Sequence, residues 1–488
     1  MTRDVVASRP HPDPTPRSGR GFGWGPNSNT PPNRGHTPVL NRLPLLAPLL
    51  LATPALAATV PVAPGGLAAA LEAASPGDVL VLRPGTHDGP VRVTVPVTLA
   101  GEPGAVVAGT GTGHVVHVTA PGVTIRGLEI KGSGTSLFDQ HAGVFLGKEA
   151  EGAVVEDNRI TGNLIGVYVW GAKDSLVRGN LVQGRRDLRV SERGNGIQLW
   201  NAPGTRVIGN TVRDGRDGIF VTTSKRNLFQ GNRFERVRFA VHYMYTNQSE
   251  VSDNVSVGND VGYAIMYSNE LTIRNNRSER DREHGFLFNY ANSALIEGNT
   301  VAGRFQAGDM AERETVADKD MPRDLDGPDR GRRFGTWKCV FIYNANKNRF
   351  AGNRFEGCEI GVHFTAGSER NTLTGNAFID NRTQVKYVGT RHLDWSYGGR
   401  GNYWSDNAAF DLNGDGIADE AYRPNDVIDR VMWAYPAAKL LMNGPGVQVV
   451  RWAQKQFPAL HPGGVIDSAP LMNPPAAGVQ VATRKVQP

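Results

Sequence analysis

Asparagine recurs at intervals close to 22 residues through the middle of this 488-residue chain, and this repeat restricts the possible fold more than any other feature. The series comprises Asn158, Asn180, Asn210, Asn232, Asn254, Asn276, Asn299, Asn353, Asn376 and Asn402. A second landmark position lies 14 residues before the asparagine, and its occupants include Gly166, Gly196, Gly218, Ala240, Gly262, Gly285 and Cys339. Self-similarity at a fixed period indicates a solenoid, in which each repeat stacks on the next.

Each repeat has the pattern of three short strands. The residues one and three positions after the landmark are apolar, for example Ile219 and Val221. Other apolar residues lie three before the asparagine and two after it, with Ser256 and Ser278 as exceptions. Period-two alternation favours strands over helices, and strands this short bury a core only by stacking. We therefore predict an all-β fold, a right-handed parallel β-helix of about a dozen turns whose asparagines occupy left-handed bends and form a ladder.

The regions outside the repeat predict the domain organisation. Residues 58–405 are expected to form the β-helix, with a short amphipathic helix at Leu67–Ala74 that caps its first turn. A charged stretch at about 304–337 interrupts the repeat and predicts an inserted loop. Residues 406–488 are expected to form an irregular tail with a helix at 446–456.

The N-terminal 57 residues have the features of a disordered extension followed by a secretory signal peptide. Residues 1–38 are rich in Pro, Gly, Ser and Asn and lack periodicity. Arg42 then precedes an apolar run from Leu43 to Leu56, and the small residues around Ala57 predict cleavage after it. The run is too short to span a bilayer, so we expect a mature chain outside the cytoplasm without a transmembrane span of its own.

Charge and cysteine content exclude several classes of protein. The formal net charge is +6, and most of it lies in the arginine-containing N-terminal extension. The remaining chain is close to neutral, which argues against nucleic-acid binding through a broad basic face. Two cysteines exclude a disulfide framework and a zinc site made of cysteine alone. Cys339 and Cys358 fall on adjacent turns, and either a disulfide or two separate thiols is compatible with their spacing.

Two rows of outward-facing side chains are predicted after the landmark residues. The His242 row, two residues after each landmark, comprises Gln198, Phe220, His242, Ala264, Leu287 and Phe341, and His363 extends it if Gly361 is the next landmark. The Met244 row, four residues after each landmark, comprises Trp200, Thr222, Met244, Met266, Asn289 and Tyr343. Tyr245, Tyr267 and Tyr290 follow as a third column, which we expect to stack as a packing or docking surface.

His242, Met244 and Met266 form a candidate Cu(I) site. The two methionines lie on adjacent turns, and His242 is two residues from Met244 on the same face. Thioethers and imidazole are soft ligands that suit Cu(I) and suit Mg²⁺ or Ca²⁺ poorly. The alternative is an apolar outward face covered by a loop or a partner, because methionine often fills adaptable interfaces.

The same rows bear on an enzymatic alternative. Polysaccharide lyases and uronate epimerases with this fold need carboxylates and a base grouped on one outward face. The His242 and Met244 rows contain no Asp or Glu. This favours a non-enzymatic protein, although a site in the inserted loops would remain compatible with the sequence. His87, His114, His117 and His141 show no paired spacing and are expected at surface or turn positions.

The tail contains a candidate calcium loop. Asp411, Asn413, Asp415 and Asp419 have the spacing of an EF-hand-like loop, with Gly416 at the turn. Position 12 of such a loop is Tyr422 instead of glutamate, so a bidentate ligand would have to come from elsewhere, for example Glu420. The alternative is a polar turn stabilised by the side chains of its own Asp and Asn residues.

Several stretches form a combined pattern: residues 74–87, the asparagine-stepped turns with Ala240-Val-His-Tyr-Met-Tyr-Thr-Asn247, and Gly401-Asn-Tyr-Trp-Ser-Asp406 followed by 411–416. Together they resemble the NosD family of periplasmic nitrous oxide reductase maturation proteins, which are parallel β-helices of the carbohydrate-binding and sugar-hydrolase (CASH) type. The resemblance spans roughly residues 60–475. It implies a periplasmic, non-enzymatic protein that helps to build the copper–sulfur centre. The implied partners are the membrane subunit and ATPase of an ABC transporter, a copper chaperone lipoprotein and apo nitrous oxide reductase.

Overall fold

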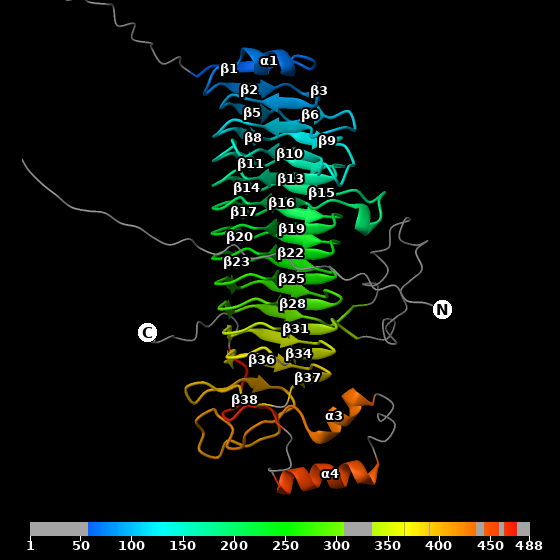
Figure 1. The fold of residues 1–488 in the computed structure, drawn as a ribbon, viewed down its shortest axis with the longest axis vertical. Helices are drawn as coiled ribbons and strands as arrows, with labels where there is room; N and C mark the ends of the chain where they lie inside the picture. The colour runs from blue at the N-terminus through cyan, green and yellow to red at the C-terminus, as the bar shows by residue number, and fades with distance from the viewer. Residues whose placement is uncertain are drawn as a thin grey trace, which may run out of the picture. The chain divides into compact units, whose positions relative to one another are not determined.

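The predicted parallel β-solenoid is confirmed (Figure 1). The structure is a computed structural model that describes residues 57–306, 334–365, 367–389, 391–435, 444–457 and 463–475. The expected extension and signal peptide up to residue 56, and residues 307–333 of the charged insertion, lie outside the described residues. The described strands stack into three parallel sheets of 13, 12 and 13 strands, which agrees with the predicted number of turns.

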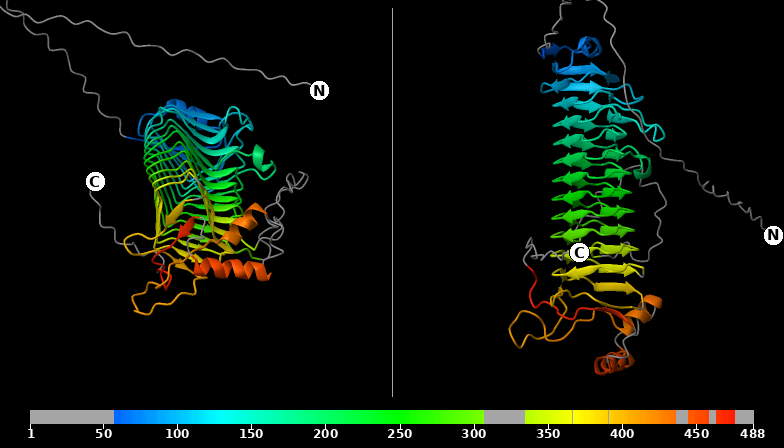
Figure 2. Two further views of the ribbon diagram at one scale, coloured as in Figure 1. Left: turned by 60° about the horizontal axis from the view of Figure 1, so that its bottom comes forward. Right: turned by 60° about the vertical axis from the view of Figure 1, so that its left-hand side comes forward.

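Each turn contributes one strand to each sheet, and the strands of a sheet lie one above another (Figure 2). Sheet A contains β1 (Thr59–Val62), β2 (Val79–Leu82), β5 (Thr98–Gly101), β8 (Thr124–Arg126), β11 (Val154–Glu156), β14 (Leu176–Arg178), β17 (Arg206–Ile208), β20 (Leu228–Gln230), β23 (Glu250–Ser252), β26 (Thr272–Arg274), β29 (Leu295–Glu297), β32 (Arg349–Ala351) and β35 (Thr372–Thr374). Sheet B contains β3 (Gly85–Asp88), β6 (Ala105–Ala108), β9 (Glu129–Lys131), β12 (Arg159–Thr161), β15 (Leu181–Gln183), β18 (Thr211–Arg213), β21 (Arg233–Glu235), β24 (Val255–Val257), β27 (Arg277–Glu279), β30 (Thr300–Ala302), β33 (Arg354–Glu356), β36 (Ala377–Ile379) and β39 (Tyr403–Trp404). Sheet C contains β4 (Val91–Val93), β7 (Val116–Val118), β10 (Ala142–Leu146), β13 (Ile165–Trp170), β16 (Ile197–Trp200), β19 (Asp217–Thr222), β22 (Phe239–Met244), β25 (Val261–Met266), β28 (His284–Asn289), β31 (Lys338–Tyr343), β34 (Ile360–Thr365) and β37 (Thr383–Val388).

The repeated asparagines form a continuous buried ladder between sheets A and B. In each turn the backbone N–H donates to the side-chain oxygen of the asparagine one turn on, as from Asn232 to Asn254 at 2.9 Å. The side-chain nitrogen donates to the same oxygen, at 2.9 Å in that pair, and to a carbonyl oxygen of sheet A. Every turn therefore fixes the position of the next, and the buried polar groups of the bend are satisfied.

The predicted backbone conformation of the ladder asparagines was wrong by one residue. The left-handed positions are those immediately before the asparagines, including Asp157, Gly231, Asp253 and Asn275. Glycine, aspartate and asparagine tolerate a positive φ better than other residues do, which explains why they precede the repeat asparagine. The asparagine itself is thus free to direct its amide along the stack.

The two serines that interrupt the apolar pattern belong to a polar network inside the solenoid. The hydroxyls of Ser256 and Ser278 donate to the same oxygen of the buried Asp281, at 2.7 and 2.6 Å. The Asn259 side chain donates to the Ser256 hydroxyl at 2.8 Å. Serine at these positions supplies the hydrogen bonds that a buried carboxylate requires.

Both ends of the solenoid are closed. At the N-terminal end α1 (Leu67–Ala73) buries Leu67 and Leu71, which confirms the predicted capping helix. At the C-terminal end Asp467 follows β40 (Gly464–Ile466), which pairs with β38 (His392–Asp394). Its carboxylate accepts hydrogen bonds from the backbone N–H of Asn402 at 2.7 Å and from the Trp404 indole at 2.9 Å. An acceptor-only group thus terminates the asparagine ladder.

Within the described part of the tail, two helices follow the solenoid. They are α3 (Val427–Ala434) and α4 (Pro445–Gln456), and α4 confirms the helix predicted at 446–456. A 3₁₀ turn also lies among the described turns of the solenoid. The 3₁₀ turn is Val190–Glu192.

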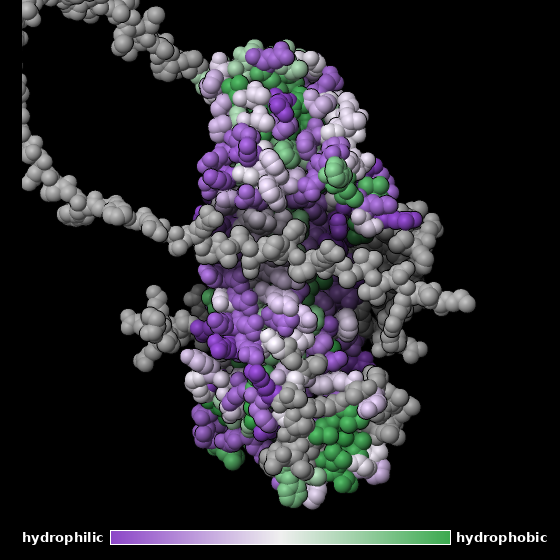
Figure 3. Space-filling model, in the orientation of Figure 1, coloured by the Kyte–Doolittle hydropathy of each residue, from purple (hydrophilic) through white to green (hydrophobic). Residues whose placement is uncertain are grey.

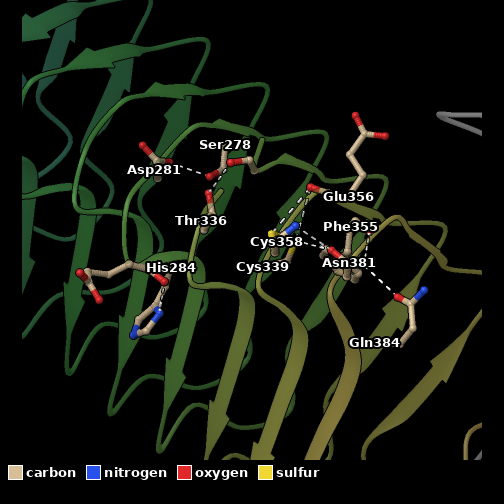
Figure 4. Close-up of a disulfide and its surroundings, with 12 residues drawn as sticks. Ser278, Asp281, His284, Thr336, Cys339, Phe355, Glu356, Cys358, Asn381 and Gln384 are labelled. Atoms are coloured by element: carbon tan, nitrogen blue, oxygen red, sulfur yellow. Dashed lines mark hydrogen bonds between the residues drawn. A yellow bond between two sulfur atoms is a disulfide. The ribbon is translucent and has the colours of Figure 1, made fainter. Parts of the chain in front are cut away.

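A disulfide joins Cys339 to Cys358, which resolves the alternative that the sequence left open (Figure 4). Both residues are fully buried. The backbone N–H of Cys358 donates to the side-chain oxygen of Asn381 at 3.0 Å, so the link lies within the hydrogen-bonded interior of the stack. Such a bond persists in an oxidising compartment.

Candidate metal site on sheet C

Sheet C aligns the two predicted outward rows in register. His242 on β22 has Phe220 and Ala264 as its Cα partners on the adjacent strands. Met244 and Met266 are Cα partners on β22 and β25, as predicted. Neighbouring strands lie about 4.8 Å apart, so the two thioether side chains start from adjacent points on one face. The register also places His363 in the His242 row, opposite Phe341.

His242 is more enclosed than its outward position suggested. Its exposed fraction is 9%, and the rings of Phe220 and Phe239 lie 5.0 and 4.9 Å from its ring, centroid to centroid. Met244 and Met266 are half-buried. The Nε2 atom of His242 is buried and has no hydrogen-bond partner. A buried ring nitrogen without a protein partner can be completed by a water or by a ligand.

Asp217, the first residue of β19, contacts the opposite nitrogen of the same ring. Its Oδ2 atom lies 2.9 Å from Nδ1 of His242. An ionised carboxylate only accepts hydrogen bonds, so Nδ1 carries a proton, and in the neutral ring Nε2 presents its lone pair. Histidines that bind metals generally donate their other N–H to a carboxylate or carbonyl in this way.

Arg238 keeps the Asp217 carboxylate ionised. Its Nε and Nη2 atoms donate to the two carboxylate oxygens at 2.8 and 2.7 Å. Burial alone would raise the pKa of Asp217, but the hydrogen bonds from His242 and Arg238 outweigh it and hold that pKa below its ordinary value. The tautomer of His242 is therefore fixed by a buried, charged network.

Sequence reasoning missed Asp217 because it considered only the two rows after the landmarks. Asp217 lies immediately before the landmark Gly218, where the strand begins and the alternation of faces has not yet started. It is the only carboxylate directly before a landmark from Gly166 to Gly361. A single carboxylate at this position in the repeat was therefore the feature of the sequence that could have pointed to Asp217.

The residues around His242 fit Cu(I). Within the described ranges, no group of three or more His, Cys, Asp or Glu side chains is arranged to hold a metal ion. The candidate further ligands are the thioethers of Met244, two residues along β22, and of Met266, its Cα partner on β25. One imidazole with two thioethers is a set that selects Cu(I) over hard cations.

The tyrosine column beside the methionines stacks as predicted. The ring centroids of Tyr245 and Tyr267 are 5.1 Å apart, and those of Tyr267 and Tyr290 are also 5.1 Å apart. All three residues have a positive φ of 48–51°, a conformation that bulky side chains rarely adopt, and all three are exposed. An exposed row of strained aromatic residues gains little from burial, which favours a docking role over packing.

Three of the histidines expected at surface or turn positions lie close to one another. His114 lies 5.6 Å from His117 and 5.9 Å from His141 between ring centroids. The Nδ1 atom of His114 accepts the backbone N–H of Ala142 at 3.1 Å, so its proton is on Nε2 and that atom is not free for a metal. Burial, followed by repulsion from the other two rings, lowers the pKa of His114 to about 4. His114 is therefore neutral at neutral pH.

The candidate calcium loop is folded around Asp411. Its two carboxylate oxygens accept the backbone N–H groups of Gly414 at 2.7 Å and of Gly416 at 2.8 Å. Asp419 accepts the N–H of Leu412 at 2.7 Å, and the loop is largely exposed. These hydrogen bonds are those expected of a polar turn, which was the alternative to a calcium-binding loop.

Comparisons with known proteins place the chain in a family. A family model described as "Periplasmic copper-binding protein (NosD)" matches residues 181–409. A probable ABC transporter binding protein NosD of Stutzerimonas stutzeri is 39% identical over 404 residues, which are 83% of this chain and 88% of that protein. A protein of the same description from Pseudomonas aeruginosa is 39% identical over 421 residues, 84% of this chain and 94% of that protein. The chain belongs to the NosD family.

Solved structures resemble this NosD-family chain only at the level of the solenoid. A mannuronan C-5 epimerase module from Azotobacter vinelandii has a TM-score of 0.45 and 14% identity, over 69% of this chain and 92% of that chain. An alginate lyase from Paenibacillus has a TM-score of 0.40 and 20% identity, over 50% of this chain and 95% of that chain. Similarity at this level says nothing about activity.

The residues matched by the NosD family model include the whole candidate copper site. His242, Met244 and Met266 lie within residues 181–409, as does Asp217, whereas the candidate calcium loop begins at Asp411, just beyond them. In the part of the NosD-family chain that the structure describes, no helix has the length and apolar character needed to cross a membrane.

Proposed function

We propose that this NosD-family chain is a periplasmic accessory protein that helps to assemble the copper–sulfur centre of nitrous oxide reductase. Its family is described as periplasmic and copper-binding, and its relatives are named as probable ABC transporter binding proteins. The observation that carries the proposal is the buried, unpartnered Nε2 of His242, oriented by Asp217 beside two in-register thioethers.

In this proposal Cu(I) is cargo that His242, Met244 and Met266 contact. Asp217 fixes the protonation of the ring so that Nε2 faces the metal, and Phe220 and Phe239 restrict the approach of water. The site offers at most three ligands from this chain, so a docked partner has room to supply another. Such an arrangement suits transfer better than storage.

The proposed partners are the membrane subunit and ATPase of an ABC transporter, a copper chaperone lipoprotein and apo nitrous oxide reductase. Val449, Trp452 and Phe457 are strongly exposed on and next to α4, and they offer a contact surface for one of these partners. Apolar side chains gather at the C-terminal end of the stack in Figure 3. Exposed apolar surface of this kind is typical of protein interfaces.

Deletion of the gene tests the proposed function. We expect nitrous oxide reductase to be exported but to lack its copper–sulfur centre, measured by copper content and absorption spectrum after purification. Complementation with the parent chain should restore the centre, and complementation with a Met244→Leu, Met266→Leu chain should not. A fully loaded reductase in the deletion strain would contradict the proposal.

The second candidate is a polysaccharide lyase or uronate epimerase on the same scaffold. Among the described strands of sheet C, Asp217 is the one carboxylate, and it is held by Arg238 and His242 and is not available as a base. The purified mature protein is therefore expected not to cleave or epimerise uronate polymers. Release of unsaturated products, detected by absorbance, would favour the enzyme instead.

A calcium site at Asp411, Asn413, Asp415 and Asp419 is a separate proposal. It rests on ligand spacing and on the folding of the loop around Asp411. Calorimetric titration with Ca²⁺ tests it, with Asp411→Asn and Asp415→Asn as the variant. If the heats of titration do not differ between the parent and this variant, the calcium site is contradicted and the loop is a polar turn.

A further inference from the structure

Lys338, His363 and Lys386 form a cationic cluster on the last turns of sheet C. His363 and Lys386 are Cα partners on β34 and β37, and Lys338 is the first residue of β31. His363 lies four strands beyond His242 in the same row, which corresponds to about 19 Å along the stack. The cluster is therefore a separate location on the face that carries the candidate copper site.

The cluster is enclosed by aromatic rings. Lys338 is only 5% exposed, and its Nζ atom lies 3.9 Å from the ring centroid of Trp337 and 4.1 Å from that of Phe341. The His363 ring is 4.9 Å from Phe341, and its Nδ1 atom is buried without a hydrogen-bond partner. Lys386 is half-buried. Three groups that normally require water are thus partly withdrawn from it.

Among the described residues, no carboxylate forms an ion pair with Lys338, His363 or Lys386. Glu359, just before β34, pairs with Arg382 instead. Burial, followed by repulsion from Lys386, lowers the pKa of Lys338 to about 8, and the charge of Glu283 opposes this shift. Burial, followed by repulsion from both lysines, lowers the pKa of His363 to about 3. Partly buried cations that no ion pair neutralises are destabilising, so a bound anion would stabilise these turns.

We propose that Lys338, His363 and Lys386 bind an oxyanion. The two ammonium groups supply point charges, and the neutral imidazole of His363 supplies a donor or acceptor at its free Nδ1. The aromatic walls restrict the ligand to a small group that reaches between the side chains, such as sulfate, phosphate or a carboxylate. The source is either a free anion or an acidic side chain of a docked protein, and the chemistry of recognition is the same.

Isothermal titration of the mature protein with sulfate, phosphate and acetate tests the proposal. Saturable binding is expected for the parent. A Lys338→Met, Lys386→Met variant keeps the apolar stems but removes both charges, and its Kd should rise about tenfold or more. Lys173→Met removes an exposed lysine elsewhere on the solenoid and should leave Kd unchanged. His363→Phe keeps the ring contact with Phe341 and should also weaken binding, so it serves if the double variant fails to fold.

A blocked tetra-aspartate peptide distinguishes the two sources. If the peptide binds at least about tenfold more tightly than acetate, the site takes an acidic side chain of a partner. If sulfate or phosphate binds as tightly as the peptide or more tightly, the site takes a free anion. The proposal is overturned if no anion binds the parent, or if the folded variants bind as the parent does.

Discussion

Replacing Asp217 with asparagine should lower the Cu(I) affinity of the His242 site by about 10–100-fold, equivalent to about 1.4–2.7 kcal/mol. Oδ2 of Asp217 accepts from both Nδ1 of His242 and Nη2 of Arg238, while Oδ1 accepts from Nε of Arg238. An amide has one oxygen, so its nitrogen must face one of these donors. Either the bond to His242 is lost or Arg238 loses a partner, and in both cases the ring loses the charge that fixes its tautomer.

Competition against a chromophoric Cu(I) chelator under reducing conditions measures this effect. Glu250→Gln is the matched control, because Glu250 also pairs with an arginine, Arg274 at 2.7 Å, but lies on sheet A. The control should bind Cu(I) as the parent does, and thermal unfolding confirms that both variants fold. An Asp217→Asn affinity within about twofold of the parent would refute the argument that this carboxylate orients His242.

Two further predictions concern stability. Lys338→Met should be more stable than the parent at about pH 7. At that pH Lys338 is charged in both the folded and the unfolded chain, and burial disfavours the charge in the folded state. The difference in stability should shrink between about pH 8 and 10.4, where Lys338 has lost its proton in the folded parent but not in the unfolded chain. Urea unfolding at both ends of this range checks it, and a difference that does not change with pH would contradict the burial of the charge. Asp467→Leu should destabilise the C-terminal turns by about 3 kcal/mol or more, because it leaves the N–H donors of Asn402 and Trp404 unpaired. Asp467→Asn keeps an acceptor and should cost less. Tryptophan fluorescence during denaturation follows both variants, and equal stability of the two would exclude the capping role of Asp467.

The solenoid and its register were predictable because the repeat carries the same information in every turn. A fixed spacing from landmark to asparagine places Met244 against Met266 and stacks Tyr245 on Tyr267, and the structure agrees on both. The capping helix at Leu67 was predictable for a similar reason, since its apolar residues have helical spacing. Local patterns suffice wherever the neighbour in space is one repeat away in sequence.

Other features depend on contacts that no repeat specifies. Asp217 lies before its strand begins to alternate, so its contact with His242 arises from the bend and not from a row. His114 and His141 meet through a loop of irregular length. Asp467 reaches Asn402 from 65 residues further along the chain, after an irregular tail. Each of these contacts is set by three-dimensional closure rather than by periodicity.

A Cu(I) competition titration of the Met244→Leu, Met266→Leu protein tests the central claim most directly. Leucine keeps most of the volume and apolar surface, so packing and docking should change little while both sulfurs are lost. If His242, Met244 and Met266 contact the metal, the parent competes with the chelator and the double variant does not. If the double variant binds Cu(I) as the parent does and still supports maturation of nitrous oxide reductase, the methionines are interface residues and the copper assignment is wrong.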